Sequence, residues 1–198
     1  MIMFYIGPSS SGKDTYYNYT IKKYDINSII LYTTRPIREG EIDGVTYHYI
    51  SKEKMDFMDK NGMLIERRDY DTKYGVWSYA TSICNIDNLK NYLTLNTWDG
   101  YSSFIKKLDN KELFPVYFEL DPKVRLERAL KRESKEECPK YDEVERRFKS
   151  DEKDYRKELI EKYNPYIIDN NGTIDETKSQ IDNLMSKKLI KRRTNLWT

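Results

Sequence analysis

The sequence is poor in the residues that build many kinds of catalytic site. It contains one histidine, His48, and two cysteines, Cys84 and Cys138. A single histidine excludes metal sites made from several histidines and leaves only His48 for a histidine-based triad. The two cysteines form neither a metal-binding spacing nor a disulfide framework, so we expect free thiols in a reducing compartment. No apolar run reaches membrane length and the first residues lack a signal-peptide pattern, so we expect a cytoplasmic protein without membrane partners.

The sequence also lacks a large net charge of either sign. Its 198 residues carry a formal net charge of +2, although 34% of them are charged. This balance gives no reason to expect nucleic acid as a partner. The basic run 187–193 is either a patch for an acidic partner or a solvated helix end. Apolar residues make up 38%, enough for the core of one domain, and tyrosine is abundant with 18 residues.

One glycine-containing loop carries the clearest motif of the chain. It reads Gly7-Pro8-Ser9-Ser10-Ser11-Gly12-Lys13-Asp14-Thr15 and fits G-x-x-x-x-G-K. A short apolar run, 2–6, precedes it, and residues 15–24 have helical spacing. In such loops the backbone amides and the start of the helix face a phosphate, and Lys13 supplies a point charge. The pattern predicts a nucleotide phosphate site, and the alternative is an ordinary Gly/Ser turn.

The residue after the lysine departs from the usual motif. Most such loops place Ser or Thr there, whereas this chain has Asp14, followed by Thr15. A carboxylate suits Mg²⁺, so Asp14 is a candidate metal ligand acting through a bound water. Alternatively, Asp14 only favours the amino end of the helix.

Alternating apolar and helical patterns continue along the chain. The pattern predicts strands at 29–32, 45–50, 63–65, 75–77, 92–97, 115–120 and 166–168. It predicts helices at 52–60, 81–91, 100–108, 121–132, 142–163 and 177–191. Strands that alternate with helices indicate an α/β fold with a parallel sheet.

A second cluster of polar residues lies between Thr33 and Tyr47. Arg35 and Arg38 are three residues apart, and Tyr47 follows nine residues later. Two guanidinium groups and a phenol form a clamp suited to a dianionic phosphate. The alternative is a solvated loop with surface ion pairs. Because the segment follows the phosphate loop, we favour the clamp, which gives two phosphate sites in one chain.

Written as TTR-x-x-R-x-GE-x-x-G-x-x-Y, this segment resembles the corresponding segment of the guanylate kinase family. With the phosphate loop, the resemblance spans nearly the whole chain. It implies an α/β P-loop NTPase three-layer fold with a central parallel sheet, a small β-rich acceptor-binding insertion and a helical lid. We expect one domain over 1–198, with the core at 1–32, 79–124 and 164–198, the insertion at 33–78 and the lid at 125–150.

The resemblance further implies an ATP- and Mg²⁺-dependent kinase whose partners are small nucleotides, with GMP or dGMP as acceptor. The residues that it assigns to the acceptor are Arg35, Arg38, Tyr47, Glu66 and Tyr74. Thr97 is a further candidate, although the family has an acidic residue at this end of the central strand, where this chain has Asn96-Thr97. Glu66 corresponds to a carboxylate that accepts hydrogen bonds from guanine N1 and N2, and an ionised Glu is acceptor-only. The assigned catalytic cations are Lys13, Arg38, Arg128, Arg132 and Arg147, which suit the charge of a transferring phosphoryl group. Asn170 corresponds to an adenine contact. Glu66 and the lid arginines could instead be ordinary surface residues.

Several departures leave the acceptor base open. Where the family has small hydroxyl residues near guanine O6, this chain has Leu31 or Tyr32, and Val76. Each lost donor weakens discrimination by about 1–3 kcal/mol. The alternatives are a kinase for another or modified nucleotide, a ribose 1,5-bisphosphate kinase with the same Gly-Lys-Asp wording, and a non-catalytic phosphopeptide-binding module. The Arg35–Tyr47 segment argues against the sugar phosphate, and the intact phosphate loop argues against the binding module.

Overall fold

The structure, a computed structural model, describes residues 1–24, 26–72, 75–87, 89–108, 112–136 and 139–194. Its contacts divide the chain into two compact units. The loop unit comprises Met3–Ile26, Leu93–Trp98 and Phe114–Thr198, and the hairpin unit comprises Met1–Ile2, Asn27–Tyr92 and Asp99–Leu113. The predicted division into core, insertion and lid stays a prediction.

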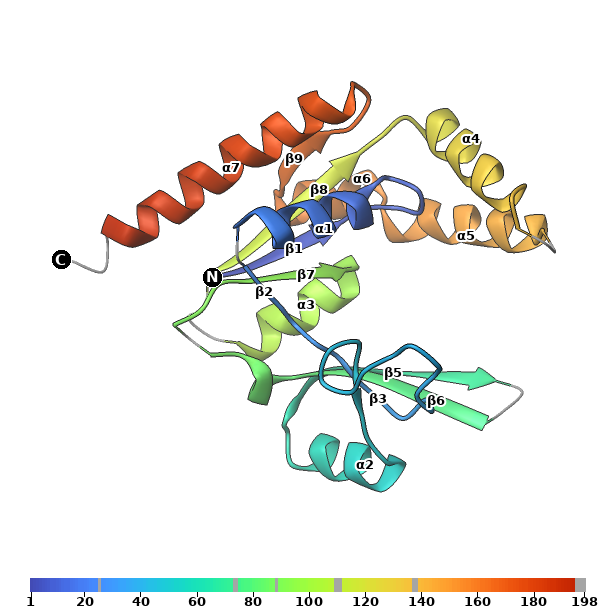
Figure 1. Ribbon diagram of the computed structural model, residues 1–198, viewed down its shortest axis with the longest axis vertical. Helices are drawn as coiled ribbons and strands as arrows, with labels where there is room; N and C mark the ends of the chain where they lie inside the picture. Colours follow the sequence, from blue (N-terminus) through green and yellow to red (C-terminus); the bar gives the residue numbers. More distant parts are fainter. Residues whose placement is uncertain (25, 73–74, 88, 109–111, 137–138, 195–198) are drawn as a thin grey trace. The chain divides into compact units, whose positions relative to one another are not determined.

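A five-stranded sheet forms the centre of the fold, in the order β2-β7-β1-β8-β9 (Figure 1). Its strands are β1 Ile2–Ile6, β2 Asn27–Ser28, β7 Tyr92–Asn96, β8 Leu113–Glu119 and β9 Tyr166–Asp169. All five residues of β1 are buried, as expected for a strand covered on both faces. Strands β8 and β9 pair in parallel, with Val116 opposite Tyr166. The predicted parallel α/β sheet is confirmed.

Five helices belong to the loop unit. They are α1 Lys13–Tyr24, α4 Pro122–Glu133, α5 Tyr141–Asp154, α6 Lys157–Tyr163 and α7 Ile174–Thr194. Helices α1 and α7 lie side by side (Figure 1), where Tyr19 and Lys23 both bond to Asp182. Asp121 caps α4 by accepting a hydrogen bond from the Lys123 amide, as its Asp-Pro start predicts. Within the described residues, no helix has both the length and the apolar content to cross a membrane.

A smaller sheet forms the hairpin unit, in the order β4-β3-β6-β5. Its elements are β3 Tyr32–Thr33, β4 His48–Tyr49, α2 Lys52–Lys60, β5 Leu64–Thr72, β6 Gly75–Ser82 and a 3₁₀ helix at Ile83–Asn85. Helix α3, Trp98–Lys107, begins in the loop unit and continues in the hairpin unit. The predicted helix 52–60 is confirmed, and Ser51 caps it through the Lys54 amide.

The two faces of the β5–β6 hairpin have different surroundings. One face packs on α2, where Leu64 and Ala80 join Met55 and Met58 in an apolar cluster. A bulge between Leu64 and Glu66 shifts the register, so that Glu66 lies opposite Thr81 and its side chain turns to the other face. That second face also carries Arg68 opposite Tyr79, and Tyr70 opposite Trp77.

Four predicted elements are wrong in detail, among them the strand at 45–50, of which only His48–Tyr49 forms β4 because a turn covers 44–46. The helix predicted at 81–91 is absent, because β6 runs to Ser82 and a short 3₁₀ turn follows. Ser82 and Asp87 bond to amides two residues ahead, which competes with helical hydrogen bonding. The strand predicted at 29–32 is displaced, since β3 covers only Tyr32–Thr33 there.

The long helix predicted at 142–163 is divided into α5 and α6. The helical pattern of charges continues across the division, so periodicity alone does not reveal it. At the break Tyr155 has a φ of −123°, and Arg156 is extended. The Tyr155 ring lies 6.3 Å from the Tyr117 ring. A tertiary aromatic contact therefore accompanies the break.

Candidate active site

The predicted phosphate loop connects β1 to α1 with a strongly curved backbone. Ser10 and Gly12 have positive φ values of 60° and 85°. A Cβ at Gly12 would come within 2.6 Å of Asn170 Nδ2, and one at Gly7 within 2.9 Å of Ser11 Oγ. Glycine is therefore required at both positions for the loop to close this tightly.

Two hydroxyl groups of this loop are buried without a partner. Ser11 is fully buried, and within the described part of the chain neither Ser10 Oγ nor Ser11 Oγ forms a hydrogen bond. Leaving a buried polar group unsatisfied costs about 1–3 kcal/mol, so such groups need a specific explanation. A polar ligand held inside the loop provides one. The buried hydroxyls thus fit a phosphate-binding loop.

Lys13 and Asp14 occupy the first turn of α1 at the end of this loop. Lys13 Nζ donates to the Pro8 carbonyl at 3.4 Å and lies 3.7 Å from Asp14 Oδ2. The Asp14 side chain is 73% exposed, and Thr15 is exposed beside it. No group of three candidate metal ligands occurs among the described residues. One carboxylate is nevertheless sufficient for Mg²⁺ that is held mainly by substrate phosphates, so Asp14 fits such a role.

A buried ion pair ties the loop to helices α4 and α5. Asp151 accepts hydrogen bonds from the Ser9 amide at 2.9 Å and from Arg125 Nη1 at 3.1 Å. Arg125 in turn donates to the Ser9 carbonyl at 3.3 Å. The side chains of Arg125 and Asp151 are only 8% and 9% exposed. The sequence analysis missed both residues, because more than a hundred positions separate them from Ser9.

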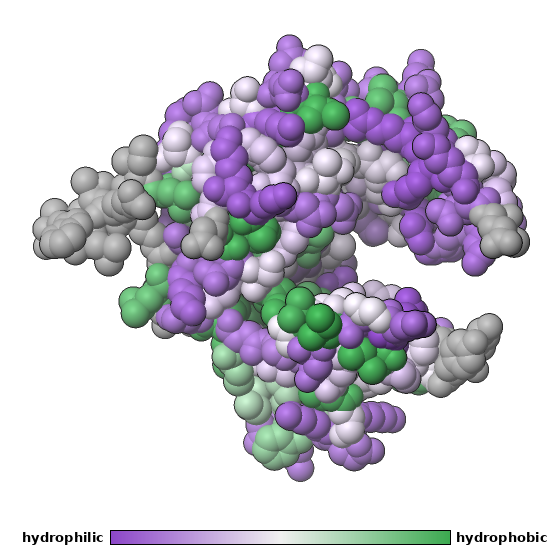
Figure 2. All heavy atoms as spheres, viewed as in Figure 1, coloured by the Kyte–Doolittle hydropathy of each residue, from purple (hydrophilic) through white to green (hydrophobic). Residues whose placement is uncertain are grey.

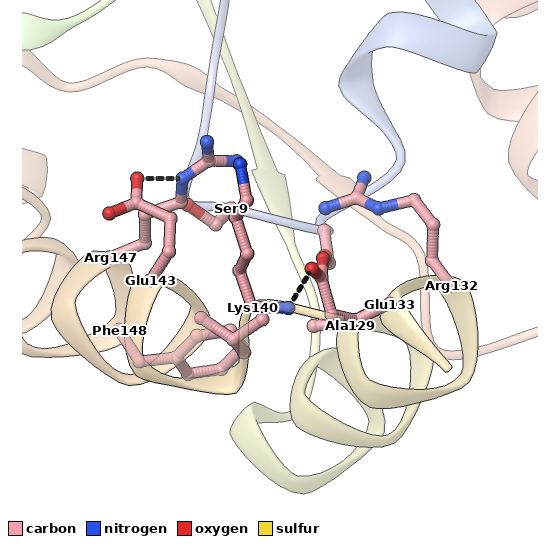
Figure 3. Close-up of a pocket in the computed structure, with 10 residues that line it drawn as sticks. Ser9, Ala129, Arg132, Glu133, Lys140, Glu143, Arg147 and Phe148 are labelled. Atoms are coloured by element: carbon pink, nitrogen blue, oxygen red, sulfur yellow. Dashed lines mark hydrogen bonds and ion pairs between the residues drawn. The ribbon is translucent and has the colours of Figure 1, made fainter. Parts of the chain in front are cut away.

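The three predicted lid arginines lie around the same loop. Arg132 and Arg147 line a pocket of about 110 Å³ together with Ser9 and Ser10. Figure 3 shows both guanidinium groups on the side of the pocket where Ser9 lies. Arg128 Nη1 lies 3.8 Å from the point where a Cβ of Gly12 would be. Helices α4 and α5 also present a largely hydrophilic surface (Figure 2).

Carboxylates partly balance the charge of this pocket. Arg147 Nε donates to Glu143 at 2.8 Å, and Glu133 accepts from the Lys140 amide at 2.6 Å (Figure 3). Hydrogen bonds from Arg146 and Arg147 lower the pKa of Glu143 to about 2. Glu143 is therefore ionised at neutral pH and pairs with Arg147 at the pocket.

Asn170 is placed behind the loop and its side-chain amide is bonded on both sides. It is 1% exposed, and its Nδ2 donates to the Ser11 carbonyl at 2.8 Å. Its Oδ1 accepts from Tyr16 and Thr177 at 2.9 and 3.0 Å. This geometry makes Asn170 a support of the loop backbone, and its predicted adenine contact stays a prediction.

The loop, Asn170 and Thr97 lie at one edge of the central sheet. They follow directly on β1, β9 and β7, and the carboxyl ends of parallel strands share an edge. The Thr97 amide donates to Asn96 Oδ1 at 2.8 Å, which turns the chain into α3. The sequence placed Thr97 correctly at a strand end, and its acceptor contact stays a prediction.

In the hairpin unit, Arg35 is buried within the predicted acceptor segment. It is 4% exposed and donates to Glu41 Oε1 at 2.7 Å. Glu41 Oε2 accepts from the Arg38 amide at 2.7 Å and from the Tyr49 hydroxyl at 2.8 Å. The hydrogen bond from Arg35 is the main cause that lowers the pKa of Glu41 to about 2. Arg35 thus shapes the segment, while Arg38 is exposed.

An open pocket of about 420 Å³, which we call the hairpin pocket, lies on the face of β5 and β6 that α2 leaves uncovered. It is lined by Leu31, Tyr47, Arg68, Tyr70, Trp77 and Tyr79. The Tyr79 ring contacts those of Tyr47 and Tyr70 at 5.7 Å each, and Arg35 stacks over Tyr47 at 5.6 Å. The predicted residues Arg35 and Tyr47 therefore lie together.

Two further residues of this unit were predicted to bind the acceptor, Glu66 and Tyr74, and the structure describes only Glu66. Glu66 Oε1 accepts from Arg68 Nη2 at 2.9 Å and from Thr81 Oγ1 at 3.2 Å. Tyr74 lies outside the described residues.

Val76 is 48% exposed and pairs with Asp71 near the hairpin end. Arg68 was not selected from the sequence, although its spacing of two from Glu66 on a strand places both on one face.

Known proteins resemble this chain in sequence and in fold. The sequence pattern of guanylate kinase matches residues 2–188. The chain is 41% identical to the guanylate kinase of Clostridioides difficile over 80 residues, which is 39% of each chain. It is 32% identical over 97 residues to the Disks large 1 tumor suppressor protein of Drosophila melanogaster, covering 48% of this chain and 10% of that protein.

A guanylate kinase of Anaplasma phagocytophilum has a similar crystal structure, with a TM-score of 0.61 and 21% sequence identity. That likeness covers 95% of this chain and 85% of the other, and it shows the fold. The matched stretches span only 34% to 59% of the length of four curated guanylate kinases. The match of the family pattern across nearly all of the chain decides the assignment. The chain belongs to the guanylate kinase family.

Proposed function

We propose that this protein is a nucleoside monophosphate kinase that transfers the γ-phosphoryl group of ATP to the 5′-phosphate of GMP or dGMP. The observation that carries the proposal is the set of unpartnered, buried hydroxyls in a tightly curved loop beside Lys13 and three arginines. Orphaned polar groups next to concentrated positive charge fit a polyphosphate. The family of the chain supports the same activity.

On the donor side, the amides of Gly12 and Lys13 and the Lys13 ammonium bind the phosphates of ATP. Arg128, Arg132 and Arg147 hold the γ-phosphoryl oxygens and stabilise the charge that they carry in the transition state. Asp14 is the residue that would hold Mg²⁺, which would neutralise phosphate charge. Asp151 keeps the Ser9 end of the loop in position for this binding.

On the acceptor side, the exposed Arg38 and the hydroxyl of Tyr47 bind the 5′-phosphate, with Tyr74 as a further predicted ligand. Arg35 and Glu41 hold the segment in shape. Glu66 accepts hydrogen bonds from the base. An acceptor phosphate oxygen then bonds to the γ-phosphorus as the bond to the ADP oxygen breaks, so no covalent enzyme intermediate forms.

A coupled assay of ADP release over a panel of nucleoside and sugar monophosphates tests the proposal. We expect GMP and dGMP to be the best acceptors, with activity that requires Mg²⁺. Faster transfer to ribose 1,5-bisphosphate or to a pyrimidine nucleotide would show that the acceptor is wrong. The panel needs no assumption about which residues bind the base.

The match to the Disks large protein favours one competing function, a non-catalytic module that binds a phosphorylated peptide through its arginines. Such a module has no use for a phosphate loop. Titration with ATP in a calorimeter separates the two functions. Binding of ATP supports the kinase, and a protein that binds a phosphopeptide but no ATP would be the module.

A further inference from the structure

An arginine–glutamate pair lies on the face of the hairpin that carries the hairpin pocket. Glu66 and Arg68 are two positions apart on β5, and Arg68 Nη2 donates to Glu66 Oε1 at 2.9 Å. The pair is asymmetric, because the side chain of Glu66 is 8% exposed while that of Arg68 is 40% exposed and lines the pocket. A carboxylate held this deep is fixed in position, and the guanidinium beside it remains accessible.

The remaining wall of the hairpin pocket is aromatic and apolar. Rings of Tyr47, Tyr70, Trp77 and Tyr79 surround Arg68, and Leu31 completes the lining. Flat rings that contact one another edge to face suit a flat heteroaromatic ligand, which stacks on them and uses its edge for hydrogen bonds. Among the described residues of the lining, the one charged side chain, that of Arg68, is therefore placed to read that edge.

The pair presents an acceptor next to a donor. Among the described residues, the hydrogen bonds of Glu66 go to Oε1, so the carboxylate has Oε2 for a ligand. A guanidinium has five N–H groups, and the contact with Glu66 uses one of those on Nη2. A ligand edge that offers a donor beside an acceptor is complementary to this arrangement.

A 6-oxopurine has such an edge, since its N1–H donor is next to the O6 acceptor. A 6-aminopurine has the reverse, with an acceptor at N1 and a donor at the amino group. We propose that Arg68 is a specificity-determining residue that donates to O6, while Glu66 accepts from N1–H. The inference rests on the proposed function and adds Arg68 to the residues that select its base. It also supplies the O6 donor that Leu31 and Val76 lack, since the Tyr32 hydroxyl donates to Asn85 Oδ1 at 3.0 Å.

Comparison of IMP with AMP isolates this edge, because the two nucleotides differ only at position 6 and N1. We expect the wild-type protein to prefer IMP in kcat/KM and in calorimetric affinity. In Arg68→Met the ratio of IMP to AMP should fall by about 10- to 100-fold, as for loss of a charged hydrogen bond. Arg68→Gln keeps an N–H donor and should give an intermediate ratio.

Arg67 provides a matched control, since it occupies the adjacent position on the opposite face of β5. It bonds to Asp56 of α2 and to Asp69, and it does not line the pocket. Arg67→Gln should therefore leave the ratio unchanged. Because Arg68→Met leaves Glu66 without its cation, the double variant Glu66→Gln/Arg68→Met removes the unpaired charge. It should recover thermal stability and should not recover the preference for IMP.

The outcomes separate the inference from the proposed function. A folded Arg68→Met variant with the wild-type ratio would overturn the role of Arg68 and leave the kinase intact, since Arg68 would then only pair with Glu66. A wild-type protein that neither binds nor phosphorylates any nucleoside monophosphate would overturn the proposed function itself, and the role of Arg68 with it. A fall in the ratio with Arg68→Met alone, and none with Arg67→Gln, supports the assignment.

Discussion

Each unit of the molecule contains a buried arginine paired with a carboxylate that shapes a loop, but the two pairs are built differently. In the loop unit, Arg125 and Asp151 come from two helices and hold Ser9. In the hairpin unit, Arg35 and Glu41 are six residues apart and hold the segment between them. The first pair fixes parts of the chain that are distant in sequence, and the second closes a single local turn.

The comparison separates two tasks of arginine in this protein. Arginines that are buried against a carboxylate partner, such as Arg35 and Arg125, fix the backbone around them. Arginines with exposed side chains, such as Arg38 and Arg132, remain able to approach an incoming anion. A count of arginines near a phosphate site therefore overstates the charge available to the ligand.

The largest effect should come from Lys13→Met, which removes the cation of the phosphate loop. We expect phosphoryl transfer to fall by at least about 10³-fold, since the lysine acts on the transferred group. Calorimetric binding of GMP should not change, because its proposed contacts lie in the hairpin unit. Lys22→Met, an exposed lysine in the last turn of α1, is the control. Equal loss in both variants would contradict a specific role for Lys13.

Asp151→Ala should have the next largest effect, on stability. Removal of one partner from a buried ion pair costs about 3–5 kcal/mol, because Arg125 keeps an uncompensated charge. Urea denaturation measures the loss, and the KM for ATP should rise because Ser9 is released. Replacement of both partners by apolar residues, Arg125→Met/Asp151→Leu, should recover much of the stability without restoring the KM. Recovery of both would show that the pair does not position the loop.

Arg38→Ala should act on the acceptor alone. We expect the KM for the acceptor to rise by about tenfold and kcat to fall, with the KM for ATP and the melting temperature unchanged. Arg35→Ala should instead lower the melting temperature, because it leaves Glu41 without its main partner. If Arg38→Ala left both the acceptor KM and kcat at their wild-type values, the assignment of Arg38 to the acceptor phosphate would be wrong.

The contrast between local and distant partners explains which features the sequence could predict. Gly7 to Lys13 is a contiguous motif between a strand and a helix, so its structure follows from local rules. Ser51 and the Asp121-Pro122 start mark helices for the same reason. The Arg35–Glu41 segment was recognised as a whole, although the sequence did not reveal that Glu41 takes up the charge of Arg35.

Features that depend on distant partners were not predictable in this way. No pattern links Asp151 to Ser9, because their contact exists only once α5 packs near the loop. The break at Tyr155 follows a ring contact with β8, and helical periodicity contains no sign of it. Arg68 is an intermediate case, since strand alternation pairs it with Glu66 but only the fold shows aromatic rings around it. Tertiary contacts override local pattern at all three places.

The smallest predicted effect is a change in the pH dependence of stability at the local pair. Arg35 holds the pKa of Glu41 at about 2, below the value of about 4.3 in an unfolded chain. The unfolded chain therefore takes up this proton first, so the stabilisation by ionised Glu41 is complete above about pH 5 and is lost as the pH falls towards 2. Unfolding of wild-type protein and Glu41→Gln across pH 2–7 should give curves that converge at the acid end. Parallel curves would mean that Glu41 contributes no pH-dependent stability, and that the local pair shapes its loop by hydrogen bonding alone.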